Sequence, residues 1–388
     1  MFGTHPFGLL RNPRHGVPGV TVLPASGFRR AKAAITSWPG YAPTPLHDLP
    51  AIAAAANVAA LRIKDESGRF GLGSFKALGG AYAVATLLSA ELSRHGIAVS
   101  TSAEALADGR CRGSTGSVTV TCATDGNHGR SVAWAAWRFH CQCVIFVHET
   151  VSQGRVDAIA AFGADVVRVP GTYDDAVREA DRRARAEGWF VVSDTSYPGY
   201  TEVPRDVMQG YRLMADEAAD QWTGPPPTHV FIQAGVGGAA AAVSVQIRAR
   251  FGTAPVLVVA EPDRAACLFA SARAGTLTAV GGNLDTIMAG LACGEPSLLA
   301  WQELERAAFA FTTIPDAAAT DAMRLLAGAG LSIGESGVAG LAALMLAAQD
   351  RAACGTLRLS PASRVLCFAT EGVTDSFSYQ NLLGSHQR

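Results

Sequence analysis

Segments with the pattern of a β-strand alternate with segments with the pattern of an α-helix along most of this sequence. The strand-like runs are short and rich in valine, isoleucine, threonine and phenylalanine. Four of them are each followed by a run with helical period (117–124, 141–147, 164–169 and 228–233). Because strand, helix and strand in this order form parallel βαβ units, the pattern predicts an α/β fold. We expect two lobes, each with a mainly parallel sheet flanked by helices.

The length and one proline-rich stretch predict how the chain is divided. A chain of 388 residues is longer than the ~250–300 residues at which a single hydrophobic core stops growing. A glycine and three prolines at 224–227 interrupt the alternation and indicate a boundary. We expect a large domain made of residues 1–78 and 223–388, with a smaller domain, residues 79–222, inserted in it.

The composition favours a small partner over nucleic acid or a membrane. The net charge is −1, with 17% charged and 49% hydrophobic residues, so there is no positive excess to bind a polyanion. No apolar run approaches the ~20 residues that cross a bilayer, and the first residues lack the pattern of a secretion signal. Eight cysteines without a C-x-x-C pair favour reduced thiols. We therefore expect a cytoplasmic protein that binds a small neutral or zwitterionic molecule.

Lys76 is one of only three lysines among the 32 basic residues of the chain. It stands in the glycine-bounded stretch GLGSFKALGG (71–80), where a predicted strand gives way to a predicted helix. Most lysines are solvated surface charges, but here arginine supplies nearly all of those. A primary amine can lose its proton and form a Schiff base, whereas a guanidinium stays charged. The retained lysine therefore indicates amine chemistry at position 76.

A glycine-rich loop follows the predicted strand at 228–233. The glycines of AGVGG (234–238) let backbone N–H groups converge on an anion at the start of a helix, which predicts a phosphate site, although a tight turn is the plainer alternative. Gly235, Gly237 and Ala240, with Glu261 21 positions later, also fit a dinucleotide fingerprint. A phosphate site together with a reactive amine favours pyridoxal 5'-phosphate as the cofactor.

Seven stretches of the sequence together match one family. SFKALGGAYAV, TCATDGNHGRSVAWAA, AFGADVVRV, DTSYPGYTEVPRDVMQGY, QAGVGG, TIMAGLACGEPS and ATEGVTD resemble the diaminopropionate ammonia-lyases, which have the tryptophan-synthase-like fold (fold type II) of pyridoxal phosphate enzymes. The resemblance implies that Lys76 forms the Schiff base, that Asn127 contacts the phenolic oxygen of the ring, and that Thr370 faces its nitrogen. On local grounds Asn127 fits a helix cap equally well. The cofactor-binding residues implied are Lys76, Asn127, Gly235, Val236, Gly237, Gly238 and Thr370.

The resemblance also assigns two aspartates to the chemistry. Asp125, in TDGNHGR, matches a general base on the face opposite Lys76, so that either enantiomer of a substrate could lose its α-proton. Its local alternative is a helix N-cap. Asp194, in DTSYPGY, matches an aspartate that would bind the substrate's second ammonium or assist its departure, with a loop cap as the alternative. The catalytic residues implied are Lys76, Asp125 and Asp194.

The resemblance implies a carbon–nitrogen lyase that acts on D- and L-2,3-diaminopropionate and releases pyruvate and ammonia, and the chemistry of these residues is consistent with it. The nearest alternative is a serine or threonine dehydratase, or a β-replacement enzyme, of the same fold. More distant alternatives are a nicotinamide-dependent oxidoreductase and a catalytically silent cofactor-binding protein. The pair Tyr197-Pro198 departs from the family pattern, which leaves the exact substrate open. The family is usually homodimeric, and we expect the same here.

The remaining cysteines and histidines do not predict a metal site. His140, Cys141 and Cys143 lack a second pair of ligands, so no metal is expected. Cys267 and Cys293 match a pair that forms a disulfide in some members of the family. A reducing compartment predicts two free thiols instead.

Overall fold

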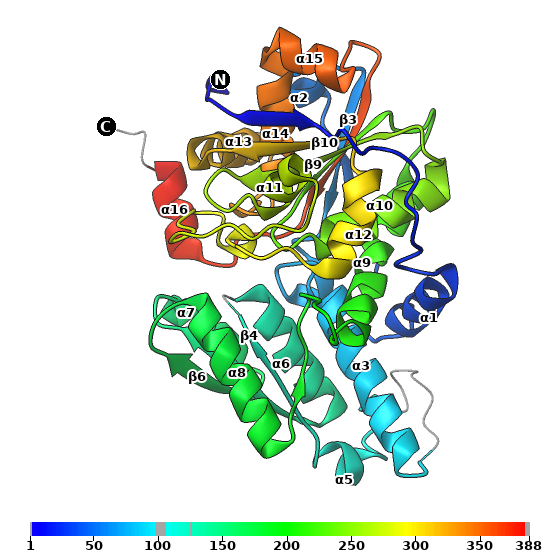
Figure 1. The fold of residues 1–388 in the computed structure, drawn as a ribbon, viewed down its shortest axis with the longest axis vertical. Coiled ribbons are helices and arrows are strands. Elements are labelled where there is room, and N and C mark those ends of the chain that lie inside the picture. The colour runs from blue at the N-terminus through cyan, green and yellow to red at the C-terminus, as the bar shows by residue number, and fades with distance from the viewer. Residues whose placement is uncertain (1, 98–105, 125, 385–388) are drawn as a thin grey trace. The chain divides into compact units, whose positions relative to one another are not determined.

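The computed structural model describes residues 2–97, 106–124 and 126–384, and it divides into two compact units. The first unit consists of Met1–Val22, Pro43–Gly68 and Met214–Arg388, and the second of Leu23–Ala42 and Arg69–Leu213. Each unit is therefore assembled from segments that are far apart in the sequence. Figure 1 shows the helices and strands of both.

The first unit is built on a seven-stranded sheet of order β1-β10-β9-β8-β11-β3-β2. The central strands run parallel, and the short edge strands β1 and β2 pair antiparallel with their neighbours. Strands β8 and β9 are buried along their whole length, as expected of parallel strands covered on both faces. The strands are β1 (Gly8–Arg11), β2 (Leu46–Asp48), β3 (Ala60–Asp65), β8 (His229–Gln233), β9 (Val256–Pro262), β10 (Ala310–Ile314) and β11 (Arg364–Ala369).

Eight helices and one 3₁₀ turn of the described chain belong wholly to this unit, and a further helix enters it. The further helix, α9 (Glu202–Gln221), contributes its C-terminal part from Met214 onward. The others are α2 (Pro50–Ala55), α10 (Gly238–Phe251), α11 (Cys267–Ala274), α12 (Leu298–Ala307), α13 (Asp316–Gly328), α14 (Ala339–Gln349), α15 (Arg351–Leu357), α16 (Ser376–Gly384) and the turn η2 (Ala289–Leu291).

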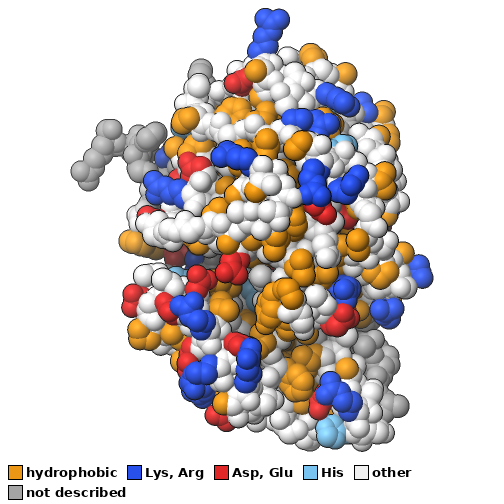
Figure 2. Space-filling model, viewed as in Figure 1, with side chains coloured by type: hydrophobic (Ala, Val, Ile, Leu, Met, Phe, Trp, Pro, Cys, Tyr) orange, Lys and Arg blue, Asp and Glu red, His pale blue; other side chains and the backbone are white. Residues whose placement is uncertain are grey.

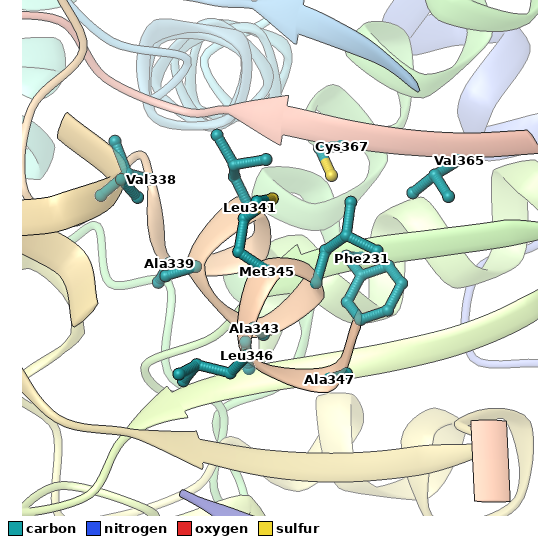
Figure 3. Close-up of a cluster of buried hydrophobic side chains, with 14 of the residues drawn as sticks. Phe231, Val338, Ala339, Leu341, Ala343, Met345, Leu346, Ala347, Val365 and Cys367 are labelled. Carbon is teal, nitrogen blue, oxygen red and sulfur yellow. The ribbon is translucent and has the colours of Figure 1, made fainter. Parts of the chain in front are cut away.

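Helix α14 lies at the centre of the hydrophobic core of the first unit. Every residue from Ala339 to Ala347 is buried, because the sequence of this helix is apolar on all sides. Figure 3 shows Leu341 and Met345 of α14 beside Phe231 of β8 and Cys367 of β11, and all four belong to one buried cluster. The core thus holds together the two strands that lead to the 235–238 loop and to Thr370.

A buried lysine joins the sheet of the first unit to α9. Lys64 of β3 has no exposure to solvent, and its Nζ lies 2.8 Å from Glu217 Oε2. It also donates to the carbonyl oxygen of Thr44 (2.6 Å) and to Gln221 Oε1 (2.9 Å). A buried ammonium needs its charge balanced and its protons bound, so these contacts explain why a lysine is kept here. Scarcity alone therefore does not distinguish Lys64 from Lys76.

The second unit is built on a parallel four-stranded sheet of order β6-β5-β4-β7. Helix α8 lies on this sheet, and three of its arginines pair with acidic residues three or four positions away. Figure 2 shows the mixed charges on this part of the surface. The elements are β4 (Thr119–Ala123), β5 (Gln142–His148), β6 (Asp165–Val169), β7 (Phe190–Val191), α1 (Ala25–Thr36), η1 (Arg69–Gly71), α3 (Ala77–Arg94), α5 (Arg112–Thr115), α6 (Asn127–Phe139), α7 (Gln153–Ala160), α8 (Tyr173–Glu187) and the first part of α9.

Helices α3 and α9 meet in the second unit at two glycines. A Cβ at Gly210 of α9 would collide with the carbonyl oxygen of Leu78 in α3. A Cβ at Gly79 of α3 would collide with the ring of Tyr211 in α9. Only glycine lets the two backbones approach so closely. The contact lies within three residues of Lys76 and so fixes the start of α3.

The sheets confirm the predicted fold class, an α/β chain with two mainly parallel sheets flanked by helices. The predicted domain division after residues 78 and 222 stays a prediction. The compact units differ from it in three segments: residues 23–42 and 69–78 join the second unit, and residues 214–222 join the first. Among the described residues, no helix has both the length and the apolar character that crossing a bilayer requires.

Replacement of Gly210 by alanine is expected to destabilise the protein by about 3 kcal/mol, because the new methyl group must push the backbones of α3 and α9 apart. A chemical denaturation curve measures the change. Gly355→Ala is the matched control, since nothing lies within 4 Å of a Cβ at that exposed helical position. The control should be neutral or gain up to about 1 kcal/mol. An equal response of both variants would contradict the close contact of the two helices.

Candidate functional site

Lys76 lies at the start of helix α3, after a turn that depends on glycine. Gly71 and Gly73 have φ angles of 71° and 73°, in the left-handed region that favours this residue. Lys76 is the N-cap residue of α3, and its side chain is 19% exposed. The partial positive charge at a helix N-terminus disfavours an ammonium. The amine therefore needs a counter-charge.

Asp194 supplies this counter-charge from a distant part of the chain. Its Oδ2 lies 2.6 Å from Lys76 Nζ, although 118 positions separate the two residues. Burial alone would raise the pKa of the Asp194 carboxyl, but the charges of Lys76 and His128 hold this pKa well below its usual range. The carboxylate is thus ionised at neutral pH. The structure brings two of the three predicted catalytic residues together as a largely buried ion pair.

The loop that carries Asp194 is held in shape by Tyr200. The Tyr200 hydroxyl donates to the carbonyl oxygen of Val191 (2.9 Å) and accepts a hydrogen bond from the N–H of Ser193 (3.0 Å). The ring of Tyr197 stacks on that of Tyr200 with 5.1 Å between centroids, and Tyr197 is 47% exposed. The departure from the family pattern at Tyr197 is therefore at the surface, whereas Asp194 is turned toward Lys76.

Asn127 is the first residue of helix α6, shortly after strand β4. The N-cap is Gly126, whose N–H donates to the Thr124 hydroxyl (3.0 Å). Asn127 is therefore not the N-cap of this helix. Because β4 and β7 are parallel neighbours, Asn127 and Asp194 both follow the carboxyl ends of strands at one edge of this sheet. Asp125 lies outside the described residues, so its role as a general base stays a prediction.

The 235–238 loop joins the buried strand β8 to helix α10 in the first unit. Gly237 is the N-cap of α10 and has a φ of 99°. A Cβ at Gly237 would lie 3.0 Å from that of Ala300, and a Cβ at Gly235 would lie 2.9 Å from Cys293 Sγ. Both positions therefore need glycine. The loop places backbone N–H groups at the N-terminus of a long helix, which is a favourable place for a phosphate.

Thr370 follows strand β11, the parallel neighbour of β8. It is 4% exposed, and its Oγ1 accepts a hydrogen bond from Gln233 Nε2 (2.6 Å). Gln233 Nε2 is held in turn by the carbonyl oxygens of Gly337 (3.1 Å) and Phe368 (3.0 Å). Because the oxygen of Thr370 accepts here, its proton can be donated to a further acceptor, and an uncharged pyridine nitrogen is one.

Glu261, the acidic residue of the alternative dinucleotide fingerprint, serves to cap a helix. It is fully buried at the end of β9, and its two oxygens accept hydrogen bonds from the N–H groups of Leu268 (2.8 Å) and Phe269 (2.7 Å) in α11. Burial raises the pKa of this carboxyl to about 8. A carboxyl group enclosed in this way does not reach a ribose, so the fingerprint loses its acidic residue.

Cys267 and Cys293 are not joined by a disulfide, and both lie beside Gly235 of the 235–238 loop. Cys267 Sγ donates to the carbonyl oxygen of Gly235 (3.6 Å), and Cys293 Sγ lies 2.9 Å from the place that a Cβ on that glycine would take. In the part of the chain that the structure describes, histidine, cysteine, aspartate and glutamate side chains form no group of three that could hold a metal ion.

Tyr211 is a neighbour of Lys76 to which the sequence reasoning gave no role. It is 1% exposed, its ring centroid lies 4.6 Å from that of Phe75, and Lys76 Nζ is 5.8 Å from the ring centroid. The sequence does contain a sign of close packing at this position, because Tyr211 ends the stretch DVMQGY. The glycine of this stretch, inside a helical pattern, indicates a close contact between helices.

Residues 37–371 match the family model of pyridoxal-phosphate dependent enzymes. The chain is 40% identical over 361 residues to the diaminopropionate ammonia-lyase of Escherichia coli K12, with 89% of each chain covered. The crystal structure of the holo form of that enzyme from Escherichia coli matches with a TM-score of 0.92 at 36% identity, covering 100% of this chain and 99% of the other. Its complex with D-serine matches with a TM-score of 0.92 at 35% identity, with the same coverage. The chain therefore belongs to the pyridoxal-phosphate dependent enzymes and, among them, to the diaminopropionate ammonia-lyase family.

Proposed function

We propose that this protein eliminates ammonia from D- and L-2,3-diaminopropionate and forms pyruvate, with pyridoxal 5'-phosphate as its cofactor. The observation that carries the proposal is the ion pair of Lys76 and Asp194, in a chain that is 40% identical to a diaminopropionate ammonia-lyase. An amine for the cofactor and a carboxylate within 2.6 Å of it suit a substrate that carries two amino groups. One diaminopropionate and one water would yield one pyruvate and two molecules of ammonia.

The residues of the chain fit pyridoxal 5'-phosphate. Lys76 would bind its aldehyde carbon, the 235–238 loop its phosphate, and Thr370 its ring nitrogen. Two observations support this fit: the glycine loop at the start of α10, which has no room for side chains at Gly235 and Gly237, and the buried Thr370 hydroxyl. The amide of Asn127 would meet the phenolic oxygen. When bound, the cofactor withdraws electrons from the α-carbon of the substrate, so that the α-proton becomes acidic.

In this proposal Lys76 and Asp194 act on different atoms of the substrate: Lys76 on the α-proton and Asp194 on the β-nitrogen. The Nζ of Lys76, once the substrate's α-amine has replaced it, takes the α-proton. The β-nitrogen leaves only if it keeps its proton, because a free amide ion is a very poor leaving group. The ionised Asp194 carboxylate stabilises this β-ammonium. Asp194 therefore has two cationic partners in this proposal: the Lys76 ammonium in the chain without cofactor, and the β-ammonium of the substrate during turnover.

Turnover of both enantiomers needs a base on each side of the α-carbon. Lys76 supplies one of them. The sequence resemblance assigns the other to Asp125, and this part of the proposal depends on that resemblance alone.

We also propose that the protein acts in the cytoplasm as a homodimer. The family resemblance supports the dimer, and the reduced thiols expected of its eight cysteines support the compartment. Light scattering on the purified protein should give twice the 40.2 kDa mass of the chain. A mass of 40.2 kDa at micromolar concentration would contradict the dimer.

Replacement of Lys76 by alanine should abolish covalent attachment of the cofactor and lower turnover on the order of 10⁴-fold, because the attachment point and a base are lost together. Borohydride reduction followed by peptide mass spectrometry locates the attachment. Lys32→Ala is the matched control, since Lys32 lies on helix α1 and not beside Asp194. An adduct on Lys32 or Lys64 in the unmodified protein would refute the assignment.

Asp194→Asn should retain the cofactor and lower kcat/KM for diaminopropionate roughly 10- to 100-fold, because a charge-assisted hydrogen bond contributes about 1.5–3 kcal/mol. Steady-state kinetics with each enantiomer, and with D-serine as a second substrate, measure the effect. The uncharged β-hydroxyl of serine should lose less than the β-ammonium of diaminopropionate. Asp181→Asn, at a half-buried position of α8 where the carboxylate pairs with Arg185, should leave both activities unchanged. An equal loss with both substrates would show that Asp194 does not recognise the ammonium.

A further inference from the structure

A cavity of about 760 Å³ lies in the second unit, at the end of α6 that is far from Asn127. It is bordered by α5, the C-terminal end of α6 and the first residues of β5, and Figure 1 shows α5 at this end of the unit. Asn127 begins α6 and Phe139 ends it, and a rise of about 1.5 Å per residue puts roughly 18 Å between them. The cavity is therefore separate from the end of α6 that belongs to the candidate catalytic site. Its volume is typical of sites for small molecules.

Hydrogen bonds join the walls of this cavity to each other. The Thr115 hydroxyl of α5 donates to the carbonyl oxygen of His140, just after α6 (3.3 Å). Gln142 Nε2, at the start of β5, donates to the carbonyl oxygen of Gly116 (3.0 Å). These bonds hold α5 against the turn between α6 and β5, so the cavity is present before any ligand binds.

The charged residues that line the cavity are basic. Arg112 of α5 and Arg138 of α6 lie in its wall with His140, and none of the described lining residues is acidic. Neither arginine forms an ion pair with a described residue, and Asp108, the acidic residue nearest to Arg112 in the sequence, is paired with Arg110. Elsewhere in this unit arginines commonly have a carboxylate partner, as do Arg94, Arg110, Arg178, Arg182, Arg185 and Arg205. The cavity thus holds positive charge that no described side chain balances.

The two arginines are placed where an anion would stabilise them. The half-buried Arg138 has its guanidinium carbon 5.3 Å from the centroid of the Trp134 ring, and its buried Nε makes no hydrogen bond among the described residues. Burial lowers the pKa of Arg138, although a guanidinium stays protonated at neutral pH. The C-terminal end of α6 favours a cation, but Arg112 is the first residue of α5, where the helix dipole disfavours one. The dipoles therefore do not explain why both cations face one cavity.

Trp137 adds an aromatic surface to the same cavity. It is 58% exposed, and its ring centroid lies 6.3 Å from that of Phe162. The exposed part of the indole leaves apolar area in water, and a planar ring stacked on it would cover that area. Positive charge and exposed aromatic surface therefore occur together in one preformed cavity.

We propose that this cavity is a second binding site, which takes a small aromatic molecule that carries a phosphate group. Arg112 and Arg138 bind the phosphate oxygens, and an N–H of His140 donates to them. Trp137 stacks on the aromatic ring. A phosphate ester carries a charge of about −1.5 to −2 at neutral pH, so it balances two guanidinium groups, whereas a single carboxylate balances only one. The inference does not depend on the proposed function, because the described residues that line the cavity include none of those assigned to catalysis.

Titration calorimetry of the protein saturated with pyridoxal 5'-phosphate tests this inference, with phenyl phosphate as the probe. Saturation with the cofactor keeps the probe from the 235–238 loop, which is the other place expected to bind a phosphate. Inorganic phosphate is the matched probe without a ring, and benzoate is the matched probe with a ring and a single charge. We expect one phenyl phosphate to bind per chain, more tightly than either of the other two probes.

The variants of the lining residues should respond differently to these probes. Arg112→Gln and Arg138→Gln should each weaken the binding of phenyl phosphate roughly 10- to 100-fold, because each removes a charge-assisted hydrogen bond. Trp137→Ala should weaken the binding of phenyl phosphate and leave that of inorganic phosphate unchanged. Arg182→Gln is the matched control and should bind as the unmodified protein does, since Arg182 is exposed on α8 and already paired with Glu179. The exposed position of Arg112 keeps the test valid even if Arg138→Gln is unstable.

Four results would overturn the inference. The first is no binding of phenyl phosphate at millimolar concentration, by calorimetry and by quenching of tryptophan fluorescence. The second is equal affinity of the unmodified protein and Arg112→Gln, which would place the probe elsewhere. The third is tighter binding of benzoate than of phenyl phosphate. The fourth is a change in the mass of Arg112→Gln or Trp137→Ala in light scattering, which would make the cavity part of a contact between two copies of the chain.

Discussion

The ammonium of Lys76 and the carboxylate of Asp194 depend on each other, because each lies where solvent reaches it poorly. Removal of either partner would leave an uncompensated charge, which costs far more than the intact pair contributes. Two other features of the second unit serve this pair. Tyr200 shapes the loop that brings Asp194 inward, and the glycine contact between α3 and α9 fixes the helix end that carries Lys76. A substrate with a second ammonium group can also replace Lys76 in this pair, since that group offers the carboxylate the same contact.

Much of the fold could be predicted from the sequence, because βαβ units produce a local pattern. The glycines of the 235–238 loop were also readable, since a strand, a glycine turn and a helix follow one another directly. The contact between Lys76 and Asp194 could not be predicted from a local pattern, because 118 positions separate the two residues. Only the family resemblance assigned both of them to one site. The fingerprint that ended in Glu261 was misleading for the same reason. Its spacing was right, but the three-dimensional structure commits that carboxyl to the start of α11.

The scarcity of lysine in the sequence does not by itself identify Lys76 as a reactive residue. Lys64 is also retained, but it is enclosed in a network of buried hydrogen bonds in which an amine has a structural use. Tyr211 is a different case: from the sequence, a tyrosine next to a glycine in a helical segment resembles an ordinary core residue, and only the structure places it beside Lys76 and Asp194.

The near absence of lysine from the surface has a practical consequence. Lys64 has no exposure and Lys76 is 19% exposed, so an acylating reagent aimed at primary amines finds few targets on the folded chain. Labels, cross-linkers and immobilisation matrices that react with primary amines would therefore attach at few positions of the chain. The extent to which Lys76 resists such a reagent would then serve as a direct gauge of how fully the site is occupied.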